Sequence, residues 1–570
     1  MRMPSRPIRA LAPAIVAVAF VTSGLQADKN KSAVPAKPDD RTIVHVLNRI
    51  GFGPRPGDVE RVREIGLQAY IDQQLQPEHL PDSAMTTRLA SFETLNKSTR
   101  ELSERYFRPA LMARQQAKQE NAQDASMKPA DQNAVPLRTP EQMEAARSQR
   151  TVMAELSEQK VLRAAYSDRQ LEEMMVDFWF NHFNVFAGKG QTRVYLTEYE
   201  RDTIRPRALG KFRDLLGAVA ESPAMLFYLD NWQSSAPIDA TTAARNRQMN
   251  PRNPYRAGPR QMPPQGSRPR TLADLPPNAQ NARPRGINEN YARELMELHT
   301  LGVDGGYTQK DVGEVARAFT GWTIANPRQG GGYRFEPRMH DDGEKIVLGH
   351  KIKGNGQKDG QEVLDLLAKH PSTAHFISTK LVRRFVADEP PKALVDRAAE
   401  RFRQTDGDIR EVVRTIVTSP EFFSAEAYRA KVKTPFEFVV SAVRATGVDL
   451  ASALPLVQTL RDLGMPLYMC QPPTGYADRA DAWVNTGALL NRMNFALALS
   501  SGRMRGGRGG FGGGFGGGAI NAPVQGSADT IVSGILAGDL SESTRTTVAK
   551  ATENPQAVAL VLGSPEFQRR

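Results

Sequence analysis

The chain has 570 residues, a formal net charge of +12 and a single cysteine, Cys470. A lone cysteine excludes an intramolecular disulfide, and the missing Cys-x-x-Cys-His motif excludes covalently attached c-type haem. No Gly-x-Ser-x-Gly elbow, P-loop or dinucleotide fingerprint is present, so nothing favours lipase-like, nucleotide-dependent or NAD-dependent chemistry.

The first 27 residues predict an export signal. Three arginines precede an apolar stretch at residues 10–25, and Ala27 is a small residue before the cut. This is the order of a Sec-type secretory signal. A membrane anchor is the alternative, but the stretch is short and contains Pro13. We therefore expect cleavage after Ala27 and a periplasmic or secreted protein that keeps no transmembrane segment.

Three later segments hold too little apolar sequence to offset the entropy of ordering, so we expect flexible insertions there. The expected organisation is a signal peptide at 1–27, a linker at 28–40, a helical domain at 41–500 with insertions at about 113–150 and 233–286, a Gly/Arg-rich loop at 501–520 and a C-terminal helical segment at 521–570.

The positive charge is concentrated in the leader and these segments. Residues 233–286 contain nine arginines against two aspartates, residues 501–518 add three arginines, and the leader holds three more, so the remaining chain is close to neutral. The Arg-Gly-Gly repeats resemble RNA-binding tracts, but an exported protein rarely meets RNA. We expect no nucleic-acid partner. The alternatives are attraction to an anionic envelope polymer and a plain solvated linker.

Helical signals dominate the rest of the chain. Apolar spacing predicts helices at residues 41–49 and 58–75. Ser167 and Gln170 form the pattern of a capping box, which would open a long helix through Phe186, and Thr308 begins a similar pattern before a second helix. The one convincing extended segment is 345–352. We predict an all-α fold with at most a small β-hairpin at 345–352.

A short repeat provides further helix starts. The sequence of residues 416–422 (IVTSPEF) recurs at 561–567 (VLGSPEF), with a fainter echo at 221–223. In each copy the serine can cap the next helix, and proline suits the first helical position. We expect a helix–turn–helix unit that is used more than once.

Five sequence blocks occur in a recognisable order. They are residues 177–183 (DFWFNHF), 288–302 (NENYARELMELHTLG), 316–322 (ARAFTGW), 340–345 (HDDGEK) and 370–374 (HPSTA). Together they resemble the bacterial "domain of unknown function 1800" family over roughly residues 41–500. The chain departs from that pattern at Gly475-Tyr476, where Gly-Trp is expected, and in its Arg- and Gly-rich insertions.

The resemblance implies an exported protein of unestablished activity. Members of the family are often encoded beside another exported family, which resembles alkaline phosphatases and sulphatases. The resemblance therefore suggests such a protein as a partner, without indicating a reaction.

The expected helix at 167–186 carries a polar stripe on an otherwise apolar surface. Glu173, Asp177, Asn181 and Asn184 fall on one side at helical spacing. The stripe is either a solvent-facing edge or the wall of a polar cleft, and buried carboxylates mark sites more often than exposed ones do. His182 either joins that cleft or packs in the core.

Two further blocks contain candidate metal-binding or acid–base residues. Glu294 and Glu297 share one side of the helix in block 288–302 and could bind one cation, with Arg293 as an anion partner. The alternative is a solvated helix face. His340 and Asp341 on a glycine-containing loop could bind a metal or form an acid–base pair, and the alternative is an ordinary turn.

We predict that these blocks meet in one divalent-metal site. The catalytic candidates are Arg293, Glu294, Glu297, His340 and Asp341, and the metal-ligand candidates are Asp177, His182, Glu294 and His340. Two hypotheses follow. The first is an extracytoplasmic, metal-assisted enzyme acting on an envelope or extracellular polymer, which requires the blocks to converge. The second is a non-catalytic helical scaffold for the phosphatase-like partner, which predicts dispersed blocks and an exposed apolar or charged patch.

Overall fold

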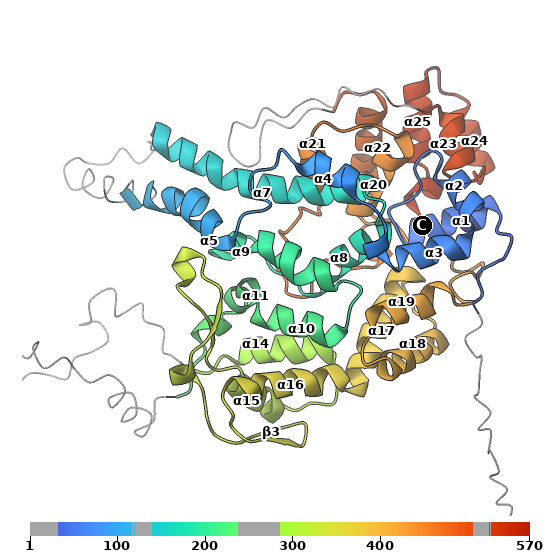
Figure 1. The fold of residues 1–570 in the computed structure, drawn as a ribbon. Helices are drawn as coiled ribbons and strands as arrows, with labels where there is room; N and C mark the ends of the chain where they lie inside the picture. Colours follow the sequence, from blue (N-terminus) through green and yellow to red (C-terminus); the bar gives the residue numbers. More distant parts are fainter. Residues whose placement is uncertain are drawn as a thin grey trace, which may run out of the picture.

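The computed structural model describes residues 32–113, 115–116, 119, 139–237, 286–504, 524 and 526–570. The predicted export signal, and most of each low-complexity segment, lie outside these residues. The described chain is mainly α-helical with two short antiparallel strand pairs, which confirms the all-α prediction (Figure 1). Within that part of the chain, no helix combines the length and the apolar character needed to cross a bilayer.

Short helices and one long helix make up the N-terminal part. They are α1 (Asp40–Arg49), α2 (Asp58–Ile65), α3 (Leu67–Gln74), α4 (Ser83–Leu89), α5 (Thr99–Leu102), α7 (Pro140–Tyr166), α8 (Gln170–His182), α9 (Thr192–Glu198), α10 (Phe212–Glu221) and α11 (Pro223–Tyr228).

The middle of the chain holds both strand pairs. Its elements are α14 (Glu289–Glu294), a π-helical turn (Leu295–Thr300), α15 (Gln309–Ala318), β1 (Trp322–Ile324), β2 (Tyr333–Phe335), β3 (Lys345–Val347), β4 (His350–Ile352), α16 (Gln357–Lys369), α17 (Pro371–Phe385), α18 (Lys392–Gln404) and α19 (Ile409–Val417). Strand β1 pairs with β2, and β3 pairs with β4.

The C-terminal part is again helical. It contains α20 (Pro435–Thr446), α21 (Leu454–Asp462), α22 (Thr486–Ser500), α23 (Ala528–Gly534), α24 (Glu542–Val548), α25 (Asn554–Leu562) and α26 (Pro565–Gln568).

The two ends of the described chain lie side by side. Figure 1 shows the blue helices α1 to α3 next to the red helices α23 to α25. His45 on α1 donates from Nε2 to the carbonyl of Phe422 at 2.8 Å, and Arg49 donates to the carbonyl of Ala427. Long-range contacts of this kind make the helices one packed body around α8, which lies near the centre of the view.

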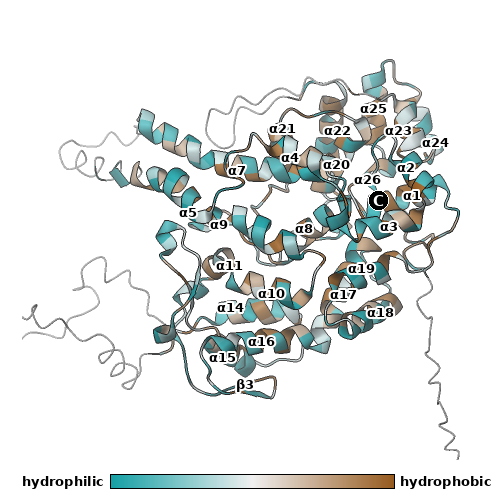
Figure 2. Cartoon of the chain, in the orientation of Figure 1, coloured by the Kyte–Doolittle hydropathy of each residue, from teal (hydrophilic) through white to brown (hydrophobic). Residues whose placement is uncertain are grey.

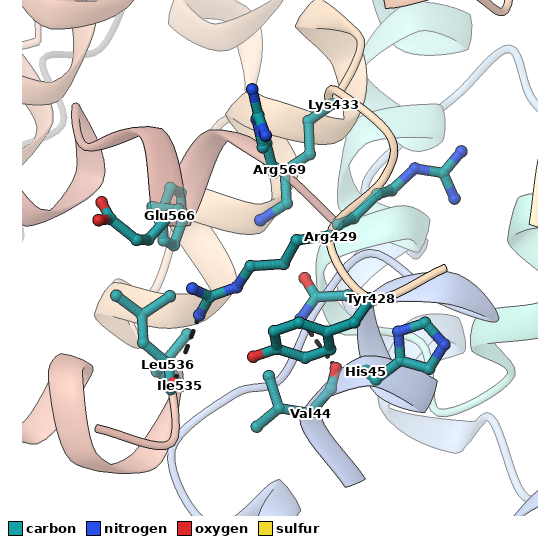
Figure 3. A pocket seen from close by; sticks show the side chains of 12 residues that line it. Val44, His45, Tyr428, Arg429, Lys433, Ile535, Leu536, Glu566 and Arg569 are labelled. Carbon is teal, nitrogen blue, oxygen red and sulfur yellow. Dashed lines mark hydrogen bonds between the residues drawn. The ribbon is translucent and has the colours of Figure 1, made fainter. Parts of the chain in front are cut away.

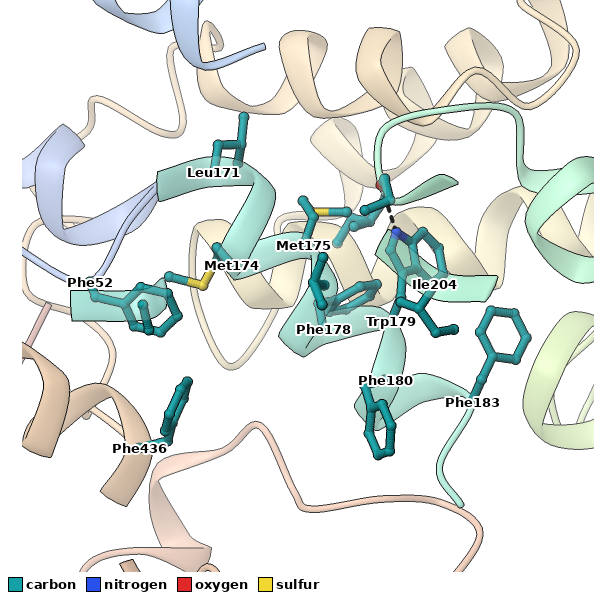
Figure 4. Packing of buried hydrophobic residues seen from close by; sticks show 14 of the residues in the cluster. Phe52, Leu171, Met174, Met175, Phe178, Trp179, Phe180, Phe183, Ile204 and Phe436 are labelled. Atoms are coloured by element: carbon teal, nitrogen blue, oxygen red, sulfur yellow. Dashed lines mark hydrogen bonds between the residues drawn. The ribbon is translucent and has the colours of Figure 1, made fainter. Parts of the chain in front are cut away.

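Helix α8 is a deeply buried part of the core. Leu171, Met174, Trp179 and Phe183 are completely excluded from solvent, and Trp179 donates from its indole nitrogen to the carbonyl of Ala208 at 2.9 Å (Figure 4). Burying each such side chain contributes roughly 1.5–3 kcal/mol. Figure 2 shows polar residues interspersed with apolar ones along α8, and the polar side chains Glu173 and His182 are also buried.

The structure corrects the predicted start and end of this helix. Ser167 ends α7, and its hydroxyl bonds Asp82 and the backbone nitrogen of Arg169. Gln170 instead accepts from the backbone nitrogen of Phe52, so Ser167 and Gln170 form no capping box. Helix α8 ends at His182, four residues before Phe186. Ser167 and Gln170 instead bond Asp82 and Phe52, which are distant in the sequence, so the local pattern does not reveal these partners.

Other local predictions have mixed outcomes. The capping box of Thr308 and Asp311 opens α15, and the hairpin at 345–352 is present as β3 and β4, so both are confirmed. Helix α7 begins at Pro140, inside the segment expected to be an insertion. Ser222 and Ser564 cap α11 and α26 as the repeat predicts, whereas Ser419 bonds Phe422 in a turn that starts no helix.

Candidate functional site

The polar stripe of α8 faces the interior. Glu173 and Asn184 are buried, and the side chain of Asp177 is 16 % exposed. Glu173 accepts two bonds from Arg205 at 2.6 and 3.0 Å. This excludes the solvent-facing edge as the explanation, because each stripe residue has a specific interior partner.

Asp177 is held by two cations from distant helices. Its carboxylate lies 3.1 Å from Lys160 Nζ on α7 and 3.7 Å from Arg384 Nη2 on α17. Lys160 is shared with Glu200 at 3.6 Å. Buried charges require such partners, since an uncompensated one costs several kcal/mol.

A cavity of about 230 Å³ opens beside this carboxylate. It lies between α8, α17 and the loop that precedes α22. Its lining residues are Asp177, Phe178, Asn181, His182, Lys380, Arg383, Arg384, Thr434, Met465, Thr474, Tyr476, Ala477, Asp478 and Arg479. We call this the Lys380 cavity.

A lysine–histidine pair forms part of the wall. His182 Nε2 lies 3.1 Å from the carbonyl oxygen of His299 and must donate to it, which leaves Nδ1 as an acceptor. Lys380 Nζ donates to that Nδ1 at 2.8 Å. Burial, then the charge of Lys380, holds the pKa of His182 well below its usual value, so the imidazole is neutral.

The amine itself has an altered basicity. Burial and then the nearby Arg383 lower the pKa of Lys380 to about 8, while Asp478 acts in the opposite direction. No carboxylate of the described residues lies within ion-pair distance of Lys380 Nζ. An amine with this pKa can gain or lose a proton near neutral pH, which is the property of a general acid–base group.

Cations dominate the rest of the wall. Arg383, Arg384 and Arg479 accompany Lys380, against the two carboxylates Asp177 and Asp478. Burial alone would raise the pKa of Asp478, but Lys431, Arg384 and Arg570 outweigh it and hold the value at about 2. Asp478 is therefore a fixed anion, and the cavity has a net positive wall.

The loop that closes the cavity is clamped to α8. Asn181 donates to the carbonyl of Tyr476 at 2.8 Å and accepts from its backbone nitrogen at 2.7 Å. Gly475 adopts φ +74°, and a Cβ there would lie 2.2 Å from the backbone oxygen of Asn181. Glycine is required at 475 because this loop and α8 touch through their backbones.

The structure brings only part of the predicted site together. Asp177 and His182 line the Lys380 cavity. His340 is instead enclosed with Asp359, whose carboxylate lies 3.1 Å from its Nε2, while Nδ1 lies 2.8 Å from the carbonyl oxygen of Thr320. Lys345 Nζ bonds the same Asp359 oxygen at 2.5 Å. We call these three fully buried side chains the His340 cluster.

Asp341 and the residues of block 288–302 have partners of their own. Asp341 pairs with Arg317 at 2.9 Å, and Arg293 donates to Gln309 at 2.7 Å. Glu297 accepts from Tyr307 at 3.4 Å. Burial and then Glu297 raise the pKa of Glu294, which is half-buried. The catalytic roles of these residues stay predictions.

The predicted convergence on one metal ion is corrected by this geometry. Over the described residues, no group of three or more histidine, cysteine, aspartate or glutamate side chains is placed to hold a metal ion. The physical reason is that candidate groups already have other partners: Asp177 pairs with Lys160, Asp341 pairs with Arg317, and His340 bonds Asp359.

Several cavity residues were missed in the sequence. Lys380, Arg383 and Arg384 lie at positions i, i+3 and i+4 of α17, just after the block at 370–374. The available signal was a cationic stripe between the apolar residues Ile377 and Phe385, both of which are buried. The second signal was Asp478, which lies two residues after Gly475-Tyr476, where the chain departs from the family pattern.

The fold and site define a helical protein with a polar, net cationic cavity at its centre. The chain matches the family model described as "Protein of unknown function (DUF1800)" over residues 45–569, and it belongs to that family. No curated protein and no solved structure matches the chain.

Proposed function

We propose that this protein is an exported enzyme that binds an anionic group of an envelope or extracellular polymer in the Lys380 cavity and transfers a proton through Lys380. The observation that carries the proposal is the amine of Lys380, 2.8 Å from a neutral histidine acceptor on the wall of a cationic cavity. Export rests on the predicted signal of residues 1–27.

The cavity walls support an anionic ligand. Four cations outnumber two carboxylates, and Arg384 is already engaged by Glu437 at 3.0 Å. Within the described chain, Arg383 donates only to the carbonyl of Asp388. The half-exposed Arg479 pairs at the rim with the exposed Glu389 at 3.0 Å, so an anion would compete with a solvent-exposed carboxylate for Arg479. A guanidinium group matches the two oxygens of a carboxylate or phosphate, so recognition of such a group is favoured.

The size of the cavity supports a polymer unit. Its volume of about 230 Å³ is below the roughly 300–1,000 Å³ of pockets that enclose drug-sized molecules. One sugar-sized or phosphate-bearing unit fits this space, while the remainder of a longer chain would continue outside it. Apolar surface from Phe178 and Met465 offers contact to the non-polar face of such a unit.

His182 fixes the direction of the proton transfer. Its Nδ1 lone pair holds one N–H of Lys380, and the carbonyl of His299 prevents the ring from changing its tautomer. The other N–H bonds of Lys380, or its lone pair when the amine is neutral, point away from His182. A neutral Lys380 is therefore a base, and the charged form is the matching acid.

The test compares anion binding and turnover in the mature protein, residues 28–570. The probes are a sugar acid, a sugar phosphate and the neutral sugar, by calorimetry, followed by product analysis with anionic polysaccharides. Lys380→Arg keeps the positive charge at every working pH but cannot act as a base near neutrality. It should retain binding within about threefold and lose turnover by about 100-fold, as expected for a general base.

Lys380→Met should weaken both anion binding and turnover. In the wild-type protein, anion affinity should fall as the pH rises through about 8, because Lys380 then loses its charge. Lys380→Met should lack this step, and the exposed Lys392→Met is the control. Absence of anion binding, or an unchanged pH step in Lys380→Met, would refute the proposal. Binding without turnover would leave a binding protein.

One observation favours the scaffold as a second candidate. Val484, Leu489, Leu490 and Leu497 are exposed on and before α22, with Leu490 at 61 %. Exposed apolar groups of this kind are typical of protein contacts. An exported alkaline-phosphatase- or sulphatase-like protein is the proposed partner, and Leu490→Asp with Leu497→Asp should abolish its co-purification while leaving anion binding unchanged.

A further inference from the structure

A second group of buried cations lies where the last residues meet the segment before α20. Lys433 N donates to the carbonyl of Gln568 at 2.9 Å, and Arg570 N donates to that of Lys431 at 2.8 Å. This antiparallel pairing places Arg570 next to α1. The region borders the Lys380 cavity, with which it shares Arg384 and Asp478, but none of the proposed acid–base chemistry uses Lys433 or Arg570.

Positive charge exceeds negative charge in this region. Glu437 Oε1 lies 3.0 Å from Arg384 Nη1 and 2.9 Å from Arg570 Nη2, so one carboxylate pairs with two guanidinium groups. The buried cations are Arg49, Arg384, Lys431, Lys433, Arg492 and Arg570, and the carboxylates nearest to them are Glu437, Asp388 and Asp478. An excess of buried cations is costly without a counter-ion.

Lys433 is the clearest case. Its amine is buried, donates to Ser441 Oγ at 2.7 Å and lies 4.1 Å from the ring centre of Phe567. No carboxylate of the described chain lies within ion-pair distance of it. Burial lowers the pKa of Lys433 to about 7, although Glu437 opposes the shift.

Arg570 is also incompletely satisfied. Its Nη2 reaches Glu437 and the carbonyl of Arg384, but Nε and Nη1 have no hydrogen-bond partner among the described residues, and the residue is 2 % exposed. The same two nitrogens of Arg49 are unpartnered. Buried guanidinium donors are normally bonded, so several in one region indicate a missing acceptor.

Of these buried cations, Lys433 and Arg570 line a small cavity of about 10 Å³ (Figure 3). This is room for about one water-sized species. Glu566 is its one lining carboxylate, and its oxygens accept from Ser541 N and Thr544 Oγ1. The lining residues are Val44, His45, Asn48, Tyr428, Arg429, Lys433, Ile535, Leu536, Glu566, Phe567, Arg569 and Arg570.

We propose that this cavity is a binding site for a small inorganic anion, chloride, held by Lys433 and Arg570. Chloride fits because it is compact and accepts bonds from any direction, which suits an ammonium and a guanidinium group that converge from different segments. The bound ion would offset the cation excess and tie residues 568–570 to 431–433. The inference does not depend on the proposed function.

The first test is thermal unfolding of the mature protein in 0.2 M sodium chloride against 0.2 M sodium gluconate (roughly equal ionic strength), an anion too large for a one-water cavity. Chloride should raise the melting temperature by about 2–4 °C, because a ligand that binds only the folded state stabilises it. Lys433→Met should remove the difference, whereas the exposed control Lys392→Met should keep it. Equal melting temperatures for the wild-type protein in both salts would overturn the proposal, as would an unchanged difference in Lys433→Met.

A second measurement does not depend on the variant folding. Crystals of the wild-type protein soaked in sodium bromide should show an anomalous scattering peak between Lys433 and Arg570. A peak there supports the site. Peaks confined to the surface, which would be an adventitious ion only, or no peak at all would refute it.

Discussion

Two regions of this protein contain the same three residue types, a histidine, a lysine and an aspartate, in different surroundings. In the His340 cluster all three side chains are fully buried, and the aspartate bonds both the lysine and the histidine. In the Lys380 cavity the lysine bonds a neutral histidine, and the nearby Asp177 is paired with Lys160 and Arg384.

The difference separates a structural element from a candidate site. Lys345 donates to Asp359 and to the carbonyls of Asp341 and Gly343, so it holds the loop before β3 in place. Lys380 has no carboxylate partner among the described residues and lies on a cavity wall. The residue types alone therefore do not distinguish the candidate site from the structural cluster. The distinguishing property is whether the lysine already has a carboxylate partner.

The largest expected effect is in the His340 cluster. Lys345→Met should lower the free energy of unfolding by about 3–5 kcal/mol, because Asp359 would remain buried without its cation. Denaturant unfolding measures the loss. The matched control is Lys392→Met, which breaks an exposed pair with Asp396 and should leave the free energy of unfolding nearly unchanged. Similar losses in the two variants would contradict a structural role for this cluster.

Gly475→Ala tests the clamp on the Lys380 cavity. The new Cβ would lie 2.2 Å from the backbone oxygen of Asn181 at φ +74°, so the left-handed strain and the clash add to an expected loss of about 2–5 kcal/mol. Gly464→Ala shares a positive φ of +85° but meets nothing within 4 Å, and should cost only about 1–2 kcal/mol. Anion binding should fall only in Gly475→Ala. If both variants bind equally, the clamp does not shape the cavity.

Tyr476→Phe should have a smaller effect. Its hydroxyl donates to the carbonyl of Pro466 at 2.8 Å, and losing that bond should cost about 0.5–1.5 kcal/mol in thermal unfolding. Because the ring remains in the cavity wall, anion affinity should change by less than about threefold. A large loss of affinity would instead assign the hydroxyl to the ligand.

The smallest effect on stability is expected for Lys380→Met. The variant removes a largely buried cation that has no carboxylate partner, so stability at pH 7 should change by less than about 1 kcal/mol or increase. The sign follows from the lowered pKa. The folded protein loses this proton at about pH 8 and the unfolded chain near its usual value of about 10.5, so the wild-type protein gains stability from this group between those pH values.

Lys380→Met should lack that gain, which denaturant titrations at pH 7 and pH 10 can measure. A loss comparable with that of Lys345→Met at pH 7 would make Lys380 a structural residue and remove the contrast between the two regions.

The sequence by itself determined the local features of this protein. Apolar spacing predicted the helical fold, Thr308 and Asp311 predicted the start of α15, and residues 345–352 predicted the hairpin. The stripe from Glu173 to Asn184 was also visible, because it depends only on helical periodicity. Family membership followed from ordered blocks, which are local as well.

Only the tertiary structure decided which charges meet. Lys380 and His182 are 198 positions apart, and Asp177 and Arg384 also come from different helices. A charged side chain reaches whichever partner the packing of its helix brings close, and local sequence does not encode that packing. The predicted convergence was wrong for this reason: His340 bonds Asp359 of α16, which Lys345 of β3 also bonds, instead of meeting Asp177.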